Sequence, residues 1–335
     1  MIKITHSNLA NIAVEYKELI KSWMYFDESF ANGNAKDRIV KIIKTNGDAK
    51  YVEMLQYIHD NFDSLIAINS AEEFRKKAIC FIKKFKKEIL EYKKADKDDK
   101  KNTSFGLFKE KMQYFYKSFF DDNYSGNEKE FSDYSNGGWL TKKLDITTCP
   151  YCNRQYTFTI YKGLNKLKTR PQLDHFFPKS IYPFFALSFY NLIPSCPTCN
   201  HIKSENKIDI HPYMVGFDTQ YKFIAGTIDD SEFNSWVMGK RNVAIKFSAP
   251  NKNIKRLGLN ELYNEHIDYV EEIIDKCIAY NNSYYESLVN SFDGLGKTEE
   301  EIDRIIWGNY LEVADYKKRP LSKITRDILE QFGIK

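Results

Sequence analysis

Two closely spaced cysteine pairs constrain this chain more than any other feature of its sequence. Cys149 and Cys152 form a C-P-Y-C motif, and Cys196 and Cys199 form a C-P-T-C motif, with 43 residues between the pairs. Two C-x-x-C pairs are the ligand pattern of a closed tetrahedral Zn²⁺ site, in which four thiolate sulfurs lie about 2.3 Å from the metal. The intervening segment is longer than in a compact zinc ribbon, so we expect it to fold into structure of its own.

The first pair also allows a redox interpretation, because C-P-Y-C alone is the active-site tetrapeptide of glutaredoxins. That chemistry places the first cysteine at a helix N-terminus. Here the motif leads into residues 153–162, whose alternating apolar and polar residues are typical of a strand. The sequence therefore favours structural zinc over redox chemistry. Cys80 and Cys277 fall on or beside apolar helix faces, and we interpret them as inert core residues.

Positive charge is concentrated around the cysteine motifs. The 335 residues correspond to about two domains, and 42% apolar with 29% charged residues excludes wholesale disorder and fibrous repeats. The net charge of +4 is too small by itself to indicate a nucleic-acid binder. Residues 139–211, however, contain ten Lys or Arg and four Asp or Glu, a net +6, which leaves −2 for the rest of the chain.

We expect a cytoplasmic protein with no membrane partner. Residues 1–21 lack the uninterrupted apolar core of a signal peptide. The longest apolar stretch, residues 181–193, is interrupted by Pro183, Ser188 and Asn191 and is too short to span a bilayer. Because cytoplasmic thiols are kept reduced, the six cysteines are not expected to form a disulfide framework.

Helical periodicity dominates the sequence on either side of the motifs. Residues 93–102 are a mixed-charge run that we interpret as an exposed linker, and the lysines at 76–87 form either a solvated helix face or a surface for phosphates or a partner. Glu301 gives the helix that starts at Thr298 a capping box. Helices are predicted over 52–65, 74–85, 105–120 and 260–280, from Thr298 and after Pro320.

The pattern changes in the middle of the chain. Residues 132–138 are rich in turn formers and end in Gly137-Gly138, residues 162–165 offer a second turn, and residues 221–226 and 242–247 are predicted strands. We therefore expect a helical N-terminal region (1–138), a central module (139–215), and a C-terminal region of short strands followed by helices (216–335).

Polar residues follow a specific order between and after the cysteine pairs. Asp174 and His175 end one predicted strand, and Asn191 opens a second. Asn200 and Lys203 fall on a predicted short helix that starts at the second cysteine pair, where they share a face with Ser204 because they are spaced by about one helical turn.

This order, L-D-H-x-x-P, then N-L, then C-x-x-C-N-x-x-K-S over residues 149–213, resembles the HNH (ββα-metal) endonucleases, in the subgroup that holds the motif together with a four-cysteine zinc site. The resemblance implies an α+β fold in which mostly helical flanking regions surround a central ββα-metal module. The phrases at 139–156 and 173–196 more narrowly resemble the nuclease subunits of Septu-like anti-phage systems, which act beside an ATPase subunit.

The resemblance also implies roles for the polar residues. His175 matches the general base, and a neutral imidazole is suited to take a proton at physiological pH. Asp174 and Asn200 match the ligands of a catalytic Mg²⁺ or Mn²⁺, and their oxygens are the hard donors that Mg²⁺ prefers. Asn191 matches the asparagine that orients the base through backbone hydrogen bonds, and Lys203 can neutralise a phosphate.

Several polar residues near the motif keep more than one interpretation. Older HNH sequences carry His where this chain has Asn200, so His201 is a second candidate ligand at that end of the helix. His211 could be a further ligand or cap a loop. Arg154 and Arg170 could contact phosphates or lie at the edge of the core. The other histidines lie far from the motif in sequence, and we interpret them as structural or surface residues: His6, His59 and His266.

The sequence therefore predicts a metal-dependent endonuclease that hydrolyses phosphodiester bonds in nucleic acid, DNA more than RNA, as the effector of an anti-phage defence system with an ATPase partner. A zinc-stapled module that binds nucleic acid without cutting it is the alternative, since the C-x-x-C pairs do not require catalysis. The flanking helices are expected to form a scaffold and a partner-binding surface.

Overall fold

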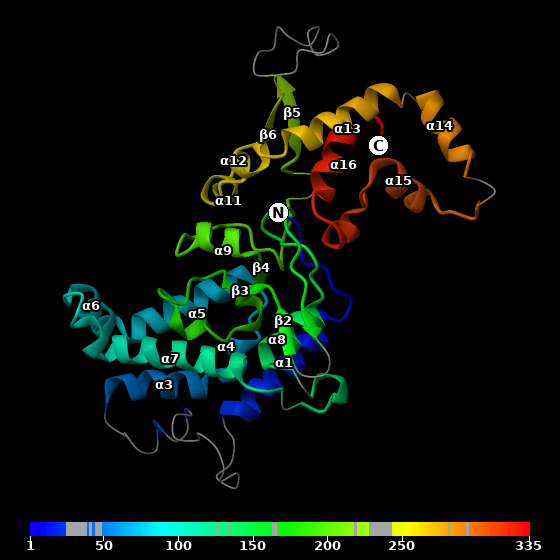
Figure 1. The fold of residues 1–335 in the computed structure, drawn as a ribbon. Helices are drawn as coiled ribbons and strands as arrows, with labels where there is room; N and C mark the ends of the chain where they lie inside the picture. Colours follow the sequence, from blue (N-terminus) through cyan, green and yellow to red (C-terminus); the bar gives the residue numbers. More distant parts are fainter. Residues whose placement is uncertain are drawn as a thin grey trace.

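The chain folds around two hydrophobic cores that meet near its middle. The computed structural model describes residues 1–24, 39, 42–43, 49–124, 126–132, 134–162, 166–217, 220–227, 243–280, 282–292 and 295–335. The large core contains buried residues from Met1 to Leu259, and the C-terminal core contains buried residues from Phe223 to Leu329. In Figure 1 the helices of residues 9–144 occupy the lower half, and those of residues 252–331 occupy the upper half.

Helices of the N-terminal region form most of the large core. Their apolar residues recur every three or four positions, so each helix buries one stripe and exposes the other face. Ser70, Thr103 and Ser135 cap three of these helices by accepting a hydrogen bond from a backbone N–H in the first turn. The helices are α1 (Leu9–Met24), α3 (Lys50–Asp60), α4 (Phe62–Ile66), α5 (Ala71–Lys84), α6 (Lys86–Lys94), α7 (Ser104–Asp121) and α8 (Asn136–Leu144), with 3-10 turns η2 (Lys100–Asn102) and η3 (Lys129–Phe131).

The turn predicted at the end of the N-terminal region is in fact the start of a helix. Ser135 caps α8, and Gly137 and Gly138 lie in its first turn. The backbone there is crowded, since a Cβ on Gly138 would lie against the Tyr161 side chain and one on Gly137 would lie 3.1 Å from Arg170 and from Phe120 O. The two glycines therefore allow close packing, where the sequence alone suggested a chain reversal. Helix α8 also runs across the boundary expected at residue 138.

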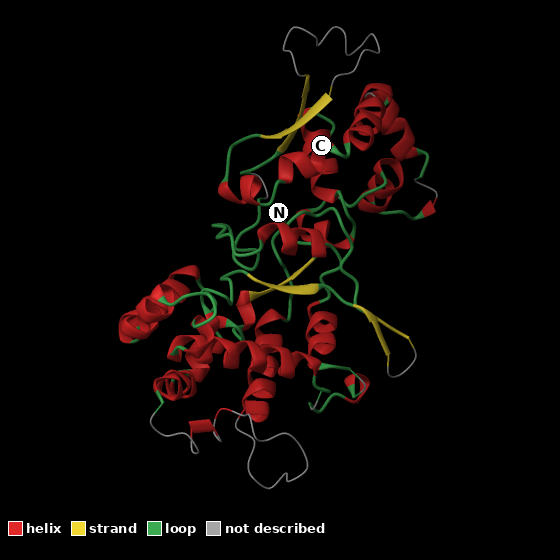
Figure 2. Cartoon of the chain, turned by 60° about the vertical axis from the view of Figure 1, so that its left-hand side comes forward, coloured by secondary structure: helices red, strands yellow, loops and turns green. Residues whose placement is uncertain are grey.

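The central segment contains two antiparallel strands followed by a short helix. β3 (Gln172–His175) pairs with β4 (Leu192–Ser195), with Asp174 opposite Ile193 and His175 opposite Leu192. The connection between the strands includes the 3-10 turns η4 (Pro183–Phe185) and η5 (Phe189–Asn191), and α9 (Pro197–Lys203) follows β4 directly. A separate hairpin, β1 (Ile160–Lys162) and β2 (Lys166–Thr169), precedes β3 and points away from the body in Figure 2.

Aromatic side chains join the central segment to the N-terminal helices. The ring of Phe74 in α5 lies 4.9 Å from that of Phe185, and Phe81 stacks on Phe184 at 4.2 Å. Tyr16 in α1 donates a hydrogen bond to the Leu187 carbonyl at 2.9 Å. The N-terminal helices therefore share one core with the connection between β3 and β4, and the aromatic residues expected near 105–120 contribute to it, as predicted for packing.

The C-terminal region contains one hairpin and a group of helices. β5 (Phe223–Thr227) pairs with β6 (Val243–Phe247), as expected for residues 221–226 and 242–247. The capping box at Thr298 and Glu301 is confirmed, and the predicted 260–280 helix is divided near His266. The helices are α11 (Lys252–Arg256), α12 (Leu259–Asn264), α13 (Ile267–Ala279), α14 (Asn282–Asn290), α15 (Glu299–Trp307) and α16 (Ser322–Gln331), with the 3-10 turn η8 (Val313–Lys318).

Other local expectations have mixed outcomes. Cys277 is buried as expected, whereas Cys80 is exposed because it lies on the solvent side of α5, so its interpretation as a core residue was wrong. The 52–65 helix is divided at Asn61. Strand geometry after the first cysteine pair is limited to residues 160–162, and residues 163–165 of the expected turn lie outside the described residues. Within the described residues, no helix combines the length and apolar composition needed to cross a bilayer.

The shared core leads to a stability prediction. Phe81 is fully buried between Tyr57, Phe85, Phe108 and Phe184, so Phe81→Ala should leave a cavity and lower the free energy of unfolding by about 3–5 kcal/mol. Ile82→Ala, at the neighbouring position that is 40% exposed, should change it by about 0.5 kcal/mol or less. Urea unfolding of both variants measures the difference, and equal effects would contradict this packing.

Candidate functional site

The four motif cysteines converge on one buried point. The sulfurs of Cys149, Cys152, Cys196 and Cys199 all lie within 4.8 Å of one another, and none of these residues is more than 1% exposed. The Cys152 and Cys196 sulfurs are 4.0 Å apart, and all four thiols are free of disulfides. Sulfurs about 2.3 Å from a tetrahedral metal lie about 3.8 Å from each other. The cluster therefore fits a Zn²⁺ ion, as the motif spacing predicted.

Local backbone geometry aims these sulfurs at one another. Asn153 adopts a left-handed conformation with φ of 50°, which closes the turn that places Cys149 and Cys152 together. Cys196 caps α9 by accepting a hydrogen bond from the Cys199 N–H at 3.4 Å, and Pro197 occupies the first helical position, where its missing N–H costs nothing. The first pair therefore lies in a turn, whereas the second pair lies at the start of α9.

Burial and mutual hydrogen bonds perturb these thiols. Burial raises the pKa of the Cys149 thiol, whereas hydrogen bonds from the other three cysteine side chains lower the pKa of Cys196. Four thiolates could not lie this close in a buried site without a counter-charge, because they would repel one another. A dication would supply that charge and release the protons, so metal binding would contribute directly to folding.

Asp174 lies beside the cysteine cluster in a buried ion pair. Its Oδ2 accepts a hydrogen bond from the Tyr151 hydroxyl at 2.6 Å, and the Lys203 ammonium lies 3.2 Å from Oδ1 and 3.0 Å from Oδ2. Both Tyr151 and Lys203 are fully buried. Burial raises the pKa of the Asp174 carboxyl, and the Lys203 charge acts in the opposite direction. Lys203 also donates to the His175 carbonyl at 2.7 Å, so it ties α9 to the end of β3.

His175 points to the other face of β3. Successive strand residues alternate between faces, and the His175 ring packs edge-on against Tyr116 of α7 at 4.6 Å, whereas Asp174 faces α9. Burial lowers the pKa of His175 to about 3, and the positive charge of Lys179 acts in the same direction, so the imidazole is neutral near pH 7. Its Nε2 lies 3.0 Å from the Ala186 carbonyl. A carbonyl only accepts, so Nε2 carries the proton and Nδ1 carries the lone pair.

Asn191 braces the connection between the two strands. It is fully buried, its Oδ1 accepts from the Phe177 N–H at 2.7 Å, and its Nδ2 donates to the Phe177 and Phe185 carbonyls at 3.2 and 2.9 Å. Phe177 lies two residues after His175, and Phe185 precedes the Ala186 carbonyl that holds the histidine ring. The side chain of Asn191 therefore fixes the backbone on both sides of the imidazole.

Asn200 and Lys203 reach neighbouring positions of the same strand face. The Asn200 amide nitrogen donates to Gln172 Oε1 at 2.6 Å, and Lys203 contacts Asp174. Asn200 and Lys203 are three residues apart on α9, and their partners Gln172 and Asp174 are two residues apart on β3. Asn200 is half-exposed and lies at the outer end of this face. The helix ends at Lys203, and Ser204 follows with a φ of 45°, so Ser204 does not extend the expected helical face.

The remaining candidate residues have different surroundings. His201 is exposed, and burial lowers the pKa of His211 to about 3, where its ring packs 4.1 Å from Phe176. Arg170 donates to the Pro171 carbonyl at 3.2 Å. His266, which is distant in sequence, accepts a hydrogen bond from Arg154 at 2.9 Å, so it lies next to the first cysteine turn.

The Lys203 ammonium already contacts the Asp174 carboxylate, so a dication bound there would share this carboxylate with Lys203. Asn200 can offer its carbonyl oxygen, because its amide nitrogen is the atom that bonds Gln172. These are oxygen donors of the type that Mg²⁺ accepts. Within the described part of the chain, the four cysteines are the only group of three or more His, Cys, Asp or Glu side chains close enough to hold a metal. Any second metal would therefore depend on Asp174, Asn200 and solvent.

Sequence reasoning missed one residue that contacts the candidate site and one that lies a single side chain away from it. Tyr151 lies inside the C-P-Y-C motif, and its hydroxyl donates a hydrogen bond to Asp174. Only the cysteines of this motif were assigned a role from the sequence. Lys179 is half-buried and lies 4.1 Å from the Tyr116 ring, which in turn contacts His175. No local sequence pattern indicated this neighbour, because residues 176–179 are not helical.

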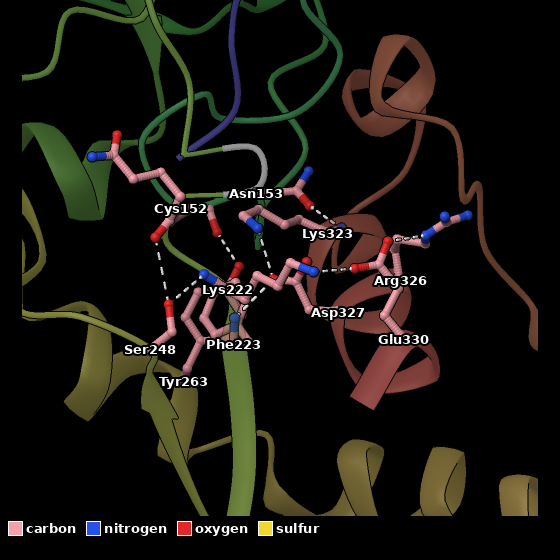
Figure 3. A network of polar contacts seen from close by, with 11 residues as sticks. Cys152, Asn153, Lys222, Phe223, Ser248, Tyr263, Lys323, Arg326, Asp327 and Glu330 are labelled. Carbon is pink, nitrogen blue, oxygen red and sulfur yellow. Dashed lines mark hydrogen bonds and ion pairs between the residues drawn. The ribbon is translucent and has the colours of Figure 1, made fainter. Parts of the chain in front are cut away.

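The first cysteine turn also anchors the C-terminal region (Figure 3). Asn153 Oδ1 accepts from the Lys323 N–H at 3.0 Å, and Tyr263 donates to the Cys152 carbonyl. In α16, Asp327 pairs with Lys323 at 2.7 Å and accepts from the Phe223 N–H at 2.8 Å. The turn that holds two cysteines therefore contacts β5, α12 and α16 through one polar network.

No protein-family profile, curated protein or solved structure matches this chain.

The cysteine cluster predicts metal content. Purified protein should carry about one zinc ion per chain, and Cys196→Ser should lose it and unfold at a lower temperature, because buried thiols without a metal no longer hold the two turns together. Cys80→Ser, at an exposed cysteine outside the cluster, should keep both properties. Elemental analysis and thermal unfolding test this, and a metal-free native protein of unchanged stability would contradict it.

The Tyr151 hydroxyl should contribute to stability. Tyr151→Phe removes one partner of a buried carboxylate, which should lower the free energy of unfolding by about 1–3 kcal/mol while the zinc content stays unchanged. Tyr156→Phe removes an exposed hydroxyl and serves as the matched control. Denaturant titration compares the two, and a Tyr151→Phe protein as stable as the control would show that the bond contributes nothing.

Proposed function

We propose that this protein is a metal-dependent endonuclease of the HNH type that hydrolyses phosphodiester bonds in nucleic acid, with DNA as the favoured substrate. The observation that carries the proposal is the order of these residues in the fold: Asp174 and His175 end β3 and point to opposite faces of it, Asn191 directly precedes β4, and Asn200 lies on α9. A ββα order with these residues at these places is the architecture that the sequence resemblance implies.

The tautomer of His175 supports a role as general base. Hydrolysis needs a group that takes a proton from water, and Nδ1 is the ring nitrogen with a free lone pair. Asn191 holds the backbone around the imidazole through three hydrogen bonds, which limits rotation of the ring. Precise placement of the base relative to the attacked phosphorus is one source of the rate enhancement.

Asp174 and Asn200 would hold a Mg²⁺ or Mn²⁺ ion in this proposal. A bound dication of this kind supplies charge stabilisation to the phosphate oxygens and the leaving group. Lys203 fixes the position of Asp174 and joins α9 to β3, and the net positive charge of residues 139–211 favours approach of a polyanion. The cysteine cluster would have a structural role in this proposal, because its first turn places the Tyr151 hydroxyl against the Asp174 carboxylate.

A nucleic-acid-binding module without catalysis is the second candidate. The observation that favours it is the ion pair of Asp174 with Lys203, which already compensates the carboxylate without a metal. In that case Asp174 and Lys203 would serve to hold α9 on β3, and the zinc-stapled surface would bind phosphates without cutting them.

Cleavage of a supercoiled plasmid distinguishes the two candidates. Nicking should require Mg²⁺ or Mn²⁺, stop with EDTA, and fall at least about 100-fold in His175→Ala, because general-base catalysis contributes about 10²–10⁴-fold. His201→Ala, at an exposed histidine one residue after Asn200, is the matched control and should keep its activity. Retained DNA affinity with no cleavage under either metal would support the binding module instead.

We further propose a role in anti-phage defence beside an ATPase partner, on the basis of the sequence resemblance. Exposed lysines on α5 and α6 offer a surface for such a partner, and Lys83, Lys86 and Lys87 make no ion pair among the described residues. Co-purification of the untagged product of a neighbouring gene would support the association, and full activity of the isolated chain would count against it.

A further inference from the structure

A strip of exposed apolar side chains runs along the segment after the first cysteine pair. Tyr156, Phe158 and Ile160 are 49%, 41% and 47% exposed, and they alternate with residues that face inward. We refer to these three residues as the aromatic strip. A lone exposed apolar residue is ordinary, whereas three at alternate positions of one short segment form a larger apolar surface.

The inward residues hold this segment in place. The Thr157 hydroxyl donates to the Ile146 carbonyl at 2.7 Å, and the Thr159 hydroxyl bonds that of Thr141 in α8 at 2.9 Å. The Thr157 N–H donates to the Thr147 carbonyl at 2.9 Å. Because the threonines are anchored to the body, the outward direction of the aromatic strip is set before any ligand binds.

The two rings of the strip are stacked on each other. The centroids of Tyr156 and Phe158 lie 4.5 Å apart with an angle of 19° between the ring planes. Within the described residues, neither ring makes a contact with another aromatic side chain. Each ring therefore has one face covered by its neighbour, and Tyr156 and Phe158 remain 49% and 41% exposed.

The strip is connected to the candidate site on two sides. Gln155, next to Tyr156, donates to the Thr198 hydroxyl of α9 at 3.3 Å. At the other end Ile160 pairs with Thr169 across the β1–β2 hairpin, and the chain reaches Gln172, the partner of Asn200, three residues later. The strip thus adjoins the outer edge of the site, where Asn200 is half-exposed.

Charged groups beside the strip favour a polyanion. Lys168 is exposed next to Thr169, and Lys142 lines a small cavity of about 50 Å³ together with Phe158. Asp145 lines the same cavity and opposes them, so the excess is positive but small. Aromatic and apolar side chains make up most of this surface, and charged side chains make up less of it. A surface that binds only phosphates would have the opposite composition.

We propose that the aromatic strip binds unpaired bases of single-stranded nucleic acid, by stacking them on the outer faces of Tyr156 and Phe158 beside the candidate cleavage site. Every base has a planar face, so such stacking is tolerant of sequence. The strip is only one chain segment wide, with Thr169 paired beside Ile160, which suits a single row of bases better than the broad apolar face of a protein. This inference rests on the proposed function and names its substrate as a strand with unpaired bases.

Binding of a fluorescein-labelled oligo(dT)20 tests the proposal, with a 20-bp duplex as comparison. In a His175→Ala background, which prevents cleavage, Tyr156→Ala/Phe158→Ala should weaken oligo(dT) binding at least about fivefold per ring removed and change duplex binding much less. Tyr156→Phe should bind as the parent does, because it keeps the ring. Ile79→Ala/Ile82→Ala removes two exposed apolar side chains from α5 and should have no effect.

Hydrolysis of bis(p-nitrophenyl) phosphate by proteins with His175 intact separates this inference from the proposed function. That phosphodiester has no bases, so the strip variant should hydrolyse it at the parental rate while losing activity on single strands. Oligo(dT) binding that is unchanged by the strip variant would overturn the inference even if the protein is a nuclease. Strip-dependent binding by a protein that hydrolyses no phosphodiester would retain the inference and reject the nuclease.

Discussion

Convergence of four sulfurs is the constraint on which the arrangement of this protein depends. Cys149 and Cys152 belong to a turn, whereas Cys196 and Cys199 begin a helix more than forty residues later, and their sulfurs lie within 4.8 Å of one another. That contact brings the first turn against β4 and α9, so Tyr151 reaches Asp174. Without it, the two short strands and the seven-residue helix would have little to hold them, because a two-stranded hairpin alone is marginally stable.

Sequence patterns located the pieces of the candidate site well. Cysteine spacing predicted the cluster, and the ends of β3 and the start of α9 fall where the polar residues indicated. These sequence signals are local, because the residues of a motif determine the turn or the helix cap in which they themselves lie. The sequence also placed Asn200 and Lys203 on one helix face, but which strand residues they meet depends on the register between α9 and β3, and the Gln172 contact had no local signal.

Long-range contacts explain what the sequence could not indicate. Gly137 and Gly138 read as a turn because glycine favours chain reversals, yet here they let α8 pack closely against other segments. His266 lies over a hundred residues from Arg154 and still bonds to it, since the C-terminal region folds back onto the cysteine turn. The opposite directions of Asp174 and His175 follow from strand alternation, and their separate partners on α9 and α7 required the tertiary structure.

The left-handed turn at Asn153 has a consequence for the whole molecule. One side chain there bonds the Lys323 backbone, and the neighbouring Cys152 carbonyl accepts from Tyr263, so both cores are attached to the same few atoms. The turn that carries two of the clustered cysteines is thus one of several contacts between the two halves, together with the bond from Thr148 to the Tyr316 carbonyl and that from Lys317 to the Thr5 carbonyl. Oxidation of those thiols would therefore disturb more than the cysteine cluster, because the turn that carries Cys152 and Asn153 also bonds Tyr263 of α12 and Lys323 of α16.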